Sequence, residues 1–456
     1  MEFKKKNRLV EWGKDLLILL LAVSAVYLLG RTQLYDSGGG QSWLSGVLSL
    51  LPGGQNEPSA QPAGGWGQGG VMRPARIALR SDVSRYGVQY DSEKVADLFA
   101  QLTNPLSDAL AGAEAPGAVS QRVWREVLTA PRPSVYLDFL GPIPLADLDA
   151  WLSGGRSANP NLTGTARRMV LAQTAGGDVV LYYINENDGL YYACKTSDSL
   201  WDRLSALVDG VPNNAVFAFE DPARYSALAP DTLLCQEAPT PRQYAAVNPI
   251  LLLSPLPNPV SLEGAPELDE FVRGLSFHPQ SYTAYAVTDG VSLQEGGDRL
   301  TITAGGVVTF RAAGEENARY PVASAGEPTL WEMVDGAWAF VEKNVGALCG
   351  DAWLYLSNLE ELPEGGVEVC FSYALDGASV QVGNEGYAAR VVVRGGAITE
   401  FTLQMRSYTA TGETTLVLQE LRAAAAMEAL DAEGAELLLC YQDRGGSPVT
   451  AGWIAR

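Results

Sequence analysis

The chain has 456 residues, of which 47% are apolar and 19% are charged, and its formal net charge is −21. This length allows two to four globular domains with a sizeable buried core. Residues 1–30 carry a net charge of +2, which leaves −23 for the rest of the chain and argues against nucleic acid or an anionic membrane surface as a partner.

The five cysteines are odd in number and form no CxxC pair, so they fit neither a zinc ribbon nor a disulfide framework. Cys194, Cys370 and Cys440 lie inside apolar, strand-like runs. We therefore expect buried free thiols that pack as small apolar side chains.

The sequence LLILLLAVSAVYLLG, residues 16–30, is a run without charge. It is close to the length of a membrane span, and four basic residues lie just before it at positions 4–8. We predict a single transmembrane helix at 16–30. The positive-inside tendency then places residues 1–15 in the cytoplasm and the chain from Arg31 onward outside the membrane.

A cleaved signal peptide is the alternative for this segment, because Val23-Ser24-Ala25 resembles a cleavage site. The apolar run continues beyond that point to Leu29, which favours a retained helix. Retention is therefore the prediction, with cleavage left open.

One face of the predicted transmembrane helix is a candidate partner-binding surface. Ile18, Ala22, Ala25 and Leu29 follow one another at spacings of four, three and four, so they share one stripe. The two alanines leave a shallow notch in which a partner helix can approach closely. Small residues occur in any span, so a featureless anchor is the alternative.

Residues 31–75 are rich in Gly, Pro, Ser and Gln and predict a flexible linker. Residues 76–248 mix strand and helix patterns and predict an N-terminal α+β domain. Its expected elements are strand 76–80, helices 91–110 and 121–129, strand 134–139, helix 145–152, strands 168–174, 179–184 and 190–196, helix 198–208 and strand 215–219.

Residues 249–375 and 376–456 predict two further α+β domains. Their expected elements are helix 267–274, strands 282–288, 298–303 and 307–311, helix 328–345, strand 367–373, a hairpin of 388–394 with 397–408, helix 416–430 and strands 435–441 and 452–454. Both stretches run strand, Gly-Gly turn, strand, helix, strand, and GVEVCFSY is similar to GAELLLCY. We predict two similar ββαβ units whose helices each cover a sheet face and bury Trp338 and Leu421.

The chain contains one histidine, His278, which excludes HExxH metal sites and other sites that need two or more histidines. The sequence also lacks GxSxG and P-loop motifs. A histidine in a turn is the simpler interpretation of Phe277-His278-Pro279 than a lone acid or base.

Paired carboxylates are better explained as solvated charge than as the acid and base of a hydrolase. These pairs are Asp147 with Asp149, Glu315 with Glu316, and Glu360 with Glu361. The segment Asn185–Gly189 offers oxygen ligands but lacks the spacing of a calcium loop, so we expect a hairpin turn.

Two tyrosine pairs, Tyr182-Tyr183 and Tyr191-Tyr192, are candidates for a carbohydrate or peptide platform. Strand alternation places one tyrosine of each pair on either face of a sheet. Half of these side chains are then expected to be core, which favours a packing role.

Several motifs in the second half of the chain are turn glycines and strand residues in a recurrent order. They are Leu275-Ser276-Phe277-His278-Pro279, Thr288-Asp289-Gly290, Arg299–Thr303 with Gly305–Phe310, Val369–Tyr373, Val391–Ile398, and Leu439–Tyr441 up to Trp453. Together with the N-terminal apolar segment, this order resembles the YycH family of Firmicutes, membrane-anchored regulators of the essential cell-wall two-component system. By this resemblance, 249–375 is a central YycH-like domain, and 376–456 is a C-terminal domain similar to YycH and to the sister family YycI.

The resemblance implies a non-enzymatic protein that uses no cofactor or metal. It implies location at the cell membrane, with the C-terminal region outside, and partners that are a sensor histidine kinase and a YycI-like single-span protein. Two other classes stay open: an exported cell-wall carboxylate hydrolase, and a surface protein that binds glycan or peptide through its tyrosine strands.

Overall fold

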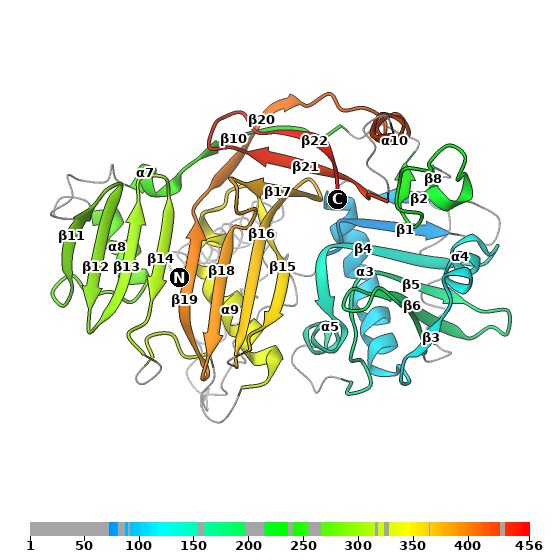
Figure 1. The fold of residues 1–456 in the computed structure, drawn as a ribbon, viewed down its shortest axis with the longest axis horizontal. Helices are drawn as coiled ribbons and strands as arrows, with labels where there is room; N and C mark the ends of the chain where they lie inside the picture. Colours follow the sequence, from blue (N-terminus) through cyan, green and yellow to red (C-terminus); the bar gives the residue numbers. More distant parts are fainter. Residues whose placement is uncertain are drawn as a thin grey trace, which may run out of the picture. The chain divides into compact units, whose positions relative to one another are not determined.

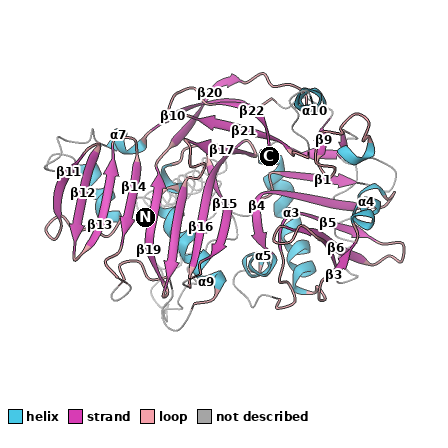
Figure 2. Cartoon of the chain, in the orientation of Figure 1, coloured by secondary structure: helices cyan, strands magenta, loops and turns pink. Residues whose placement is uncertain are grey.

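The computed structural model describes residues 73–80, 87–89, 92–153, 159–196, 214–235, 240–253, 266–314, 318–322, 328–363, 365–428 and 434–456. All of these belong to one compact unit, Gly69–Arg456. Strands predominate, and the described part contains seven α-helices (Figures 1 and 2). The predicted α+β class is confirmed. The predicted helices 16–30 and 198–208 and linker residues 31–72 lie outside the described residues.

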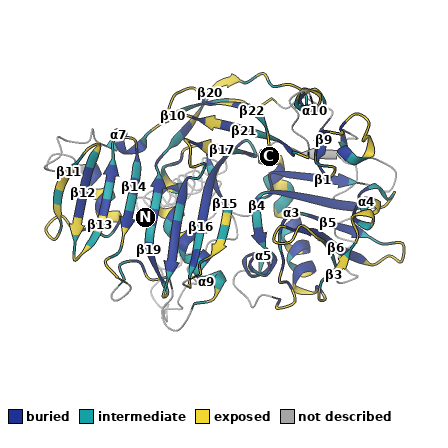
Figure 3. Ribbon diagram, viewed as in Figure 1, coloured by how far each residue is buried: buried dark blue, intermediate teal, exposed yellow. Residues whose placement is uncertain are grey.

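The first sheet has seven strands in the order β2-β1-β4-β5-β6-β7-β3, and neighbouring strands are antiparallel. The strands are β1 (Arg76–Arg80), β2 (Gly87–Gln89), β3 (Gly117–Val119), β4 (Ser134–Pro144), β5 (Thr165–Gln173), β6 (Val179–Asn185) and β7 (Tyr191–Lys195). β4, β5 and β6 are central, and most of their side chains are buried on both faces (Figure 3). Their long apolar runs explain this position.

Helices pack on both faces of this sheet. The elements around it are α3 (Ser92–Ala111), α4 (Gln121–Thr129), α5 (Leu145–Leu152), β8 (Ala215–Phe217) and β9 (Leu233–Cys235). On one face, α3 packs against α5, and the ring of Phe99 meets Phe139 of β4 edge to face. On the other face, α4 places Trp124 in a buried cluster with Tyr136 of β4. Each of the three described helices lies where helical periodicity predicted it, to within one residue.

The second sheet has eleven strands in the order β11-β12-β13-β14-β19-β18-β16-β17-β21-β22, with β15 pairing with β16 from the other side. The strands are β11 (Thr283–Val287), β12 (Gly290–Glu295), β13 (Asp298–Thr303), β14 (Val307–Arg311), β15 (Trp353–Glu361), β16 (Val367–Leu375), β17 (Ala378–Val382), β18 (Ala389–Arg394), β19 (Ala397–Gln404), β21 (Leu437–Asp443) and β22 (Thr450–Ala455). Only β17 and β21 pair in parallel among these described strands. The sequence prediction omitted β12, β15 and β17.

Strand alternation gives this sheet an apolar face and a polar face. The helices beside the apolar face are α8 (Pro266–Gly274) and α9 (Leu330–Asn344). Trp338 of α9 is buried, as predicted, with its ring 5.5 Å from that of Phe371, and Phe277 after α8 packs on Phe310. The polar face carries a row of hydroxyl residues across four strands, namely Ser292, Thr301, Thr309 and Thr402.

The predicted pair of similar ββαβ units is wrong in its sheet order. In the β13–β14 hairpin, the second strand, β14, is the one nearer to β16 in the sheet. In the β18–β19 hairpin, the first strand, β18, is the one nearer to β21. The helix of the second stretch, α10 (Glu420–Glu428), contacts β9 and β21, and its Leu421 is only partly buried. A glycine turn followed by an apolar strand is a common pattern, and it does not specify which edge the next strand joins.

The predicted domain boundaries do not coincide with breaks between the sheets. β10 (Arg242–Val247) lies in the predicted domain 76–248 but pairs with β20 (Ser407–Thr414), close to the end of the chain. The boundary at 375/376 falls within the β16–β17 hairpin of one continuous sheet.

Backbone and side-chain contacts join the two sheets. Gly141 of β4 lies so close to β15 that a methyl group at this position would collide with the carbonyl oxygen of Leu356. Farther along, Leu228 and Ala435 form a parallel β-bridge. A buried cluster spans the same junction and consists of Ala218, Tyr225, Leu228, Leu234, Ala423, Ala424 and Leu437.

Candidate functional site

The predicted partner-binding stripe, Ile18, Ala22, Ala25 and Leu29, lies outside the described residues. Among the helices that the structure describes, none has both the length and the apolar character needed to cross a membrane. The stripe therefore stays a prediction.

His278 lies in a turn, as predicted. Its carbonyl oxygen accepts hydrogen bonds from the backbone N–H groups of Ser281 and Tyr282. Its side chain is 72% exposed, and Nδ1 lies 3.9 Å from Oε1 of Glu295. Arg319 also pairs with Glu295, at 2.8 Å, so this carboxylate belongs to a charged contact near the surface.

Asp147 and Asp149 are buried in α5, which corrects their interpretation as solvated charges. Residues two apart in an α-helix point to opposite sides, so both carboxylates are buried because α5 is covered on almost all of its sides. Asp149 accepts a hydrogen bond from the Asn159 backbone N–H, at 2.8 Å. Burial raises the pKa of Asp147 to about 6.

The other carboxylate pairs do not form a described site. Glu360 and Glu361 are exposed at the end of β15, and Glu315 and Glu316 lie outside the described residues. Within the described part, no group of three or more His, Cys, Asp and Glu side chains is arranged to hold a metal ion. Asn185–Gly189 forms the β6–β7 hairpin turn that the sequence predicts.

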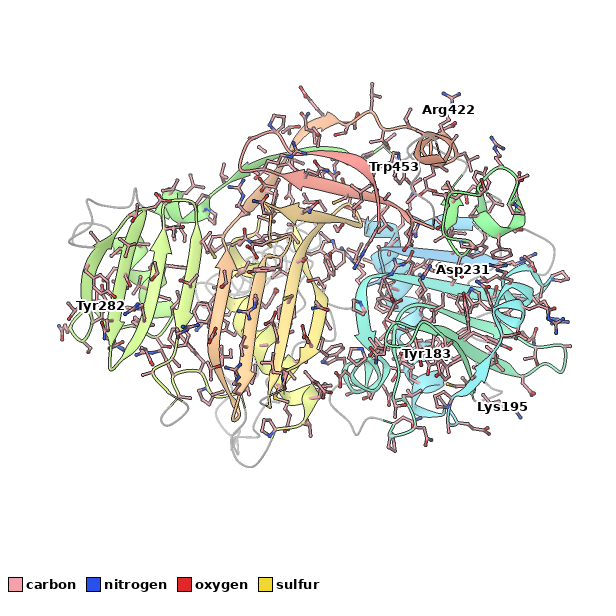
Figure 4. The ribbon with its side chains drawn as sticks, viewed as in Figure 1. Tyr183, Lys195, Asp231, Tyr282, Arg422 and Trp453 are labelled. Carbon is pink, nitrogen blue, oxygen red and sulfur yellow. The ribbon has the colours of Figure 1, made fainter. Side chains whose placement is uncertain are left out.

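The tyrosine pairs are divided between the two faces of the first sheet, as predicted. Tyr183 is buried and stacks on Tyr192 with ring centroids 5.6 Å apart, whereas Tyr182 joins the core on the α4 side. The hydroxyl of Tyr191 donates to Asp231 at 2.8 Å (Tyr183 and Asp231 are labelled in Figure 4). These contacts make the tyrosines part of the packing.

The five cysteines are all buried and free, as predicted. Burial raises the pKa of the Cys194 thiol to about 11 and that of Cys370, with a smaller contribution from the Glu368 charge, also to about 11. Thiols with such pKa values are poor nucleophiles near neutral pH.

A network of buried charges lies at the junction of the two sheets. Its members are Arg76 of β1, Asp138 of β4, Arg167 of β5, Glu420 of α10 and Glu436 next to β21. Each is at most 9% exposed. The network therefore combines residues from the start and the end of the part of the chain that the structure describes.

Asp138 is the centre of the network. It accepts hydrogen bonds at 3.0 Å from Nε of Arg76 and from Nη1 of Arg167, one on each carboxylate oxygen. Arg76 also lies 3.8 Å from Glu420 and donates to the carbonyl oxygen of Leu233. Pairing with carboxylates compensates the cost of burying two guanidinium groups.

Glu436 completes the network from the C-terminal side. It forms a hydrogen-bonded ion pair with Arg167 and lies 3.9 Å from Arg76. Burial alone would raise its pKa, but the charges of Arg167, Arg168 and Arg76 outweigh burial and lower the pKa to about 2. Glu436 is therefore ionised at any physiological pH, and the network stays charged.

A second set of charges holds the β10–β20 ribbon in place. Arg406 pairs with Asp443 through two hydrogen bonds of 2.6 and 2.7 Å, and the hydroxyl of Tyr408 donates to the same carboxylate at 2.9 Å. Arg242 of β10 pairs with Asp376 in the β16–β17 turn. Both pairs connect the ribbon to the second sheet.

The first described residues contact both sheets. The guanidinium of Arg73 lies 4.3 Å from the ring centre of Trp353, the first residue of β15. Two residues later, the backbone N–H of Ala75 donates to the carbonyl oxygen of Asp138 at 2.8 Å, and Arg76 enters the charge network. The chain thus leaves the predicted linker at the junction itself.

The sequence contained a signal for this network. Asp138 lies in SVYLDFL, Arg167 in TARRMVL and Glu436 in GAELLLC, so each charge is embedded in an apolar strand pattern. A charge in such a run is expected to be buried, and a buried charge requires a partner. The hydrogen-bonded pair of Arg167 and Glu436 alone spans 269 positions in sequence, and such a pairing follows only from the fold.

Comparison with known proteins supports the fold. No protein-family model matches the chain, and no curated protein matches it in sequence. The crystal structure of YycH from Bacillus subtilis is similar, with a TM-score of 0.52 and 12% identity, over 84% of this chain and 93% of that one. The chain has a YycH-like fold. The resemblance to YycH is confirmed at this level, and it extends over the first sheet as well as the second.

Proposed function

We propose that this protein is a membrane-anchored, extracytoplasmic regulator that modulates a sensor histidine kinase of a cell-wall two-component system through protein–protein contacts. The YycH-like fold over 84% of the chain is the observation that carries the proposal. The apolar segment 16–30 behind a basic N-terminus supplies the anchor and the orientation.

The proposed partners are the kinase and a YycI-like single-span protein. In the membrane, contact uses the stripe of Ile18, Ala22, Ala25 and Leu29, since close packing holds helices together in lipid. Outside the membrane, the junction network links the end of the linker to both sheets. The protein acts without catalysis, cofactor or metal in this proposal.

The function is tested by isolating the full-length protein from membranes of its native host after brief chemical cross-linking in cells. We expect enrichment of a sensor histidine kinase and of a single-span YycI-like protein, relative to an unrelated single-span protein with the same tag. Absence of any histidine kinase at normal abundance of the bait would contradict the proposal.

A further inference from the structure

The edges of the two sheets differ in how they are protected against pairing with other chains. The first sheet ends in β2 and β3, each only three residues long, and a short edge strand offers few hydrogen-bonding groups. In the second sheet, the edge strand β15 is covered by β4, whose Gly141 lies against the carbonyl group of Leu356. The approach to β22 is occupied by β10, because Tyr244 and Val449 exchange two backbone hydrogen bonds.

β11 differs from these edges. It pairs with β12 over all five of its residues without a bulge, and no described strand pairs with its outer side. Its sequence, TAYAV, contains neither a charge nor a proline, the residues that usually protect an edge. None of its side chains is buried, and Tyr285 is 36% exposed (Figure 3; Tyr282, just before the strand, is labelled in Figure 4).

The hydrogen-bonding groups on the open side belong to two alanines. The two-residue turn Gly296-Gly297, with φ of 61° and 97°, makes Glu295 and Asp298 a hydrogen-bonded pair. From Glu295 backward, successive residues of β12 direct their N–H and C=O groups alternately to β13 and to β11. The residues of β11 that bond to β12 are therefore Thr283, Tyr285 and Val287. Ala284 and Ala286 direct their N–H and C=O groups away from the sheet, and their methyl groups leave space for an added strand.

The charge around this edge determines which occupant fits. The described residues 266–314 and 318–322 contain six acidic and four basic residues, a net charge of −2, and the whole chain carries −21. Arg319 pairs with Glu295 and Asp298, whereas Asp289 lies in the turn between β11 and β12. Two copies would bring like charges together at the edge, which costs free energy. A segment with Lys or Arg beside its strand residues gains attraction from the same charges.

We propose that the outer edge of β11 binds an extended, cationic segment of a partner protein, which adds as a further strand to the eleven-stranded sheet. Backbone hydrogen bonds to Ala284 and Ala286 supply affinity, as in other cases of strand addition. This interaction is independent of the proposed kinase regulation and of the membrane helix.

The probe for the test is a short peptide of alternating threonine and valine with lysine at both ends, added at millimolar concentration to the full-length protein in detergent. Hydrogen exchange at the Ala284 and Ala286 amides is the measurement, because pairing at the edge protects these groups directly. We expect exchange to slow by about tenfold or more, and a peptide with glutamate in place of lysine to give much less protection.

Variants separate backbone pairing from side-chain contact. Ala286→Pro removes an outward N–H while the ladder to β12 stays intact, and proline is tolerated on such edges. It should abolish protection of Ala284, whereas Ala286→Ser should behave as the wild type. Ala286→Lys leaves the backbone unchanged and should also abolish binding of the lysine peptide by repulsion.

Three outcomes would overturn the proposal. They are unchanged exchange with the lysine peptide, equal protection by the glutamate peptide, and protection that persists in both Ala286→Pro and Ala286→Lys. Protection that instead rises with protein concentration, without peptide, would identify a second copy as the occupant and would refute a cationic partner.

Discussion

The two sheets differ in where the partners of their charged side chains come from. The first sheet buries Arg76, Asp138 and Arg167 on β1, β4 and β5. It can bury them because the last part of the chain supplies Glu420 and Glu436, at the point where the two halves meet. The second sheet has exposed ion pairs on its polar face, where Arg311 is 76% exposed beside Glu400. Its buried Asp443 pairs with Arg406, which is only 37 positions away in the sequence.

The difference suggests that the buried network is a specific joint. A buried ion network adds little net stability compared with apolar packing, but it becomes costly when one partner is removed. It therefore selects one relative arrangement of the two halves. Since Ala75 and Arg76 lie at this junction, that arrangement also fixes where the predicted linker ends.

The largest effect is expected from removing the centre of the network. Asp138→Ala leaves Arg76 and Arg167 buried with too few partners and should lower the free energy of unfolding by about 3–5 kcal/mol. Urea unfolding of the full-length protein in detergent measures the change. The matched control is Glu400→Ala on the second sheet, which should cost at most about 0.5 kcal/mol because its partner is exposed. Equal effects at both positions would refute the contrast between the sheets.

An intermediate effect is expected at the backbone contact between the sheets. Gly141→Ala places a methyl group against the Leu356 carbonyl, so β4 and β15 must move apart, at a cost of about 1–3 kcal/mol. Gly274→Ala at the end of α8 is the control, because its added methyl group meets open space, and it should change stability by less than about 0.5 kcal/mol. A neutral Gly141→Ala would show that the two sheets are not held in close contact there.

The smallest effect is expected in the pH dependence of stability, where two buried carboxyls act in opposite directions. The pKa of Glu436 falls from its ordinary value of 4.5 to about 2 in the folded state, so its stabilising contribution is complete above pH 4.5 and is lost as the pH falls toward 2. The pKa of Asp147 is raised from 3.8 to about 6, so its penalty is absent below pH 3.8 and is complete above pH 6.

Unfolding curves measured from pH 3 to pH 7 separate the two groups. Glu436→Gln should weaken the fall in the free energy of unfolding at acidic pH. Asp147→Asn should remove the decrease in the free energy of unfolding between about pH 4 and pH 6. An unchanged fall at acidic pH in Glu436→Gln would mean that the network is not closed in solution.

The sequence predicted local structure better than it predicted the arrangement of the strands. Helices α4 and α5 have the predicted bounds, because clear periodicity defines both and an N-cap serine begins α4. The strands β12, β15 and β17 were missed, because their patterns are short or interrupted by glycine and acidic residues. The pairing of β10 with β20 is separated by more than 150 positions and has no local signal.

The same limit applies to the site. Asp138 and Arg167 were not singled out from the sequence, although each lies inside an apolar strand pattern, and only the fold shows that Glu436 completes their network. The prediction for Asp147 and Asp149 was wrong, because alternate acidic residues in a short segment are usually exposed, whereas α5 is buried on both of the sides to which they point. The interpretation of His278 and of the Asn185–Gly189 turn was correct, since local turn chemistry determines both.

The most direct test of the central claim measures phosphorylation of the proposed partner kinase in host cells that carry only a variant of this protein. Ala22→Leu with Ala25→Leu fills the notch of the predicted transmembrane stripe, whereas Val23→Leu with Ser24→Leu adds bulk on the other side of the helix. At equal membrane abundance, the first variant should behave like a deletion of the gene, and the second should behave like the wild type. Wild-type phosphorylation in the first variant would contradict regulation through this face of the membrane helix.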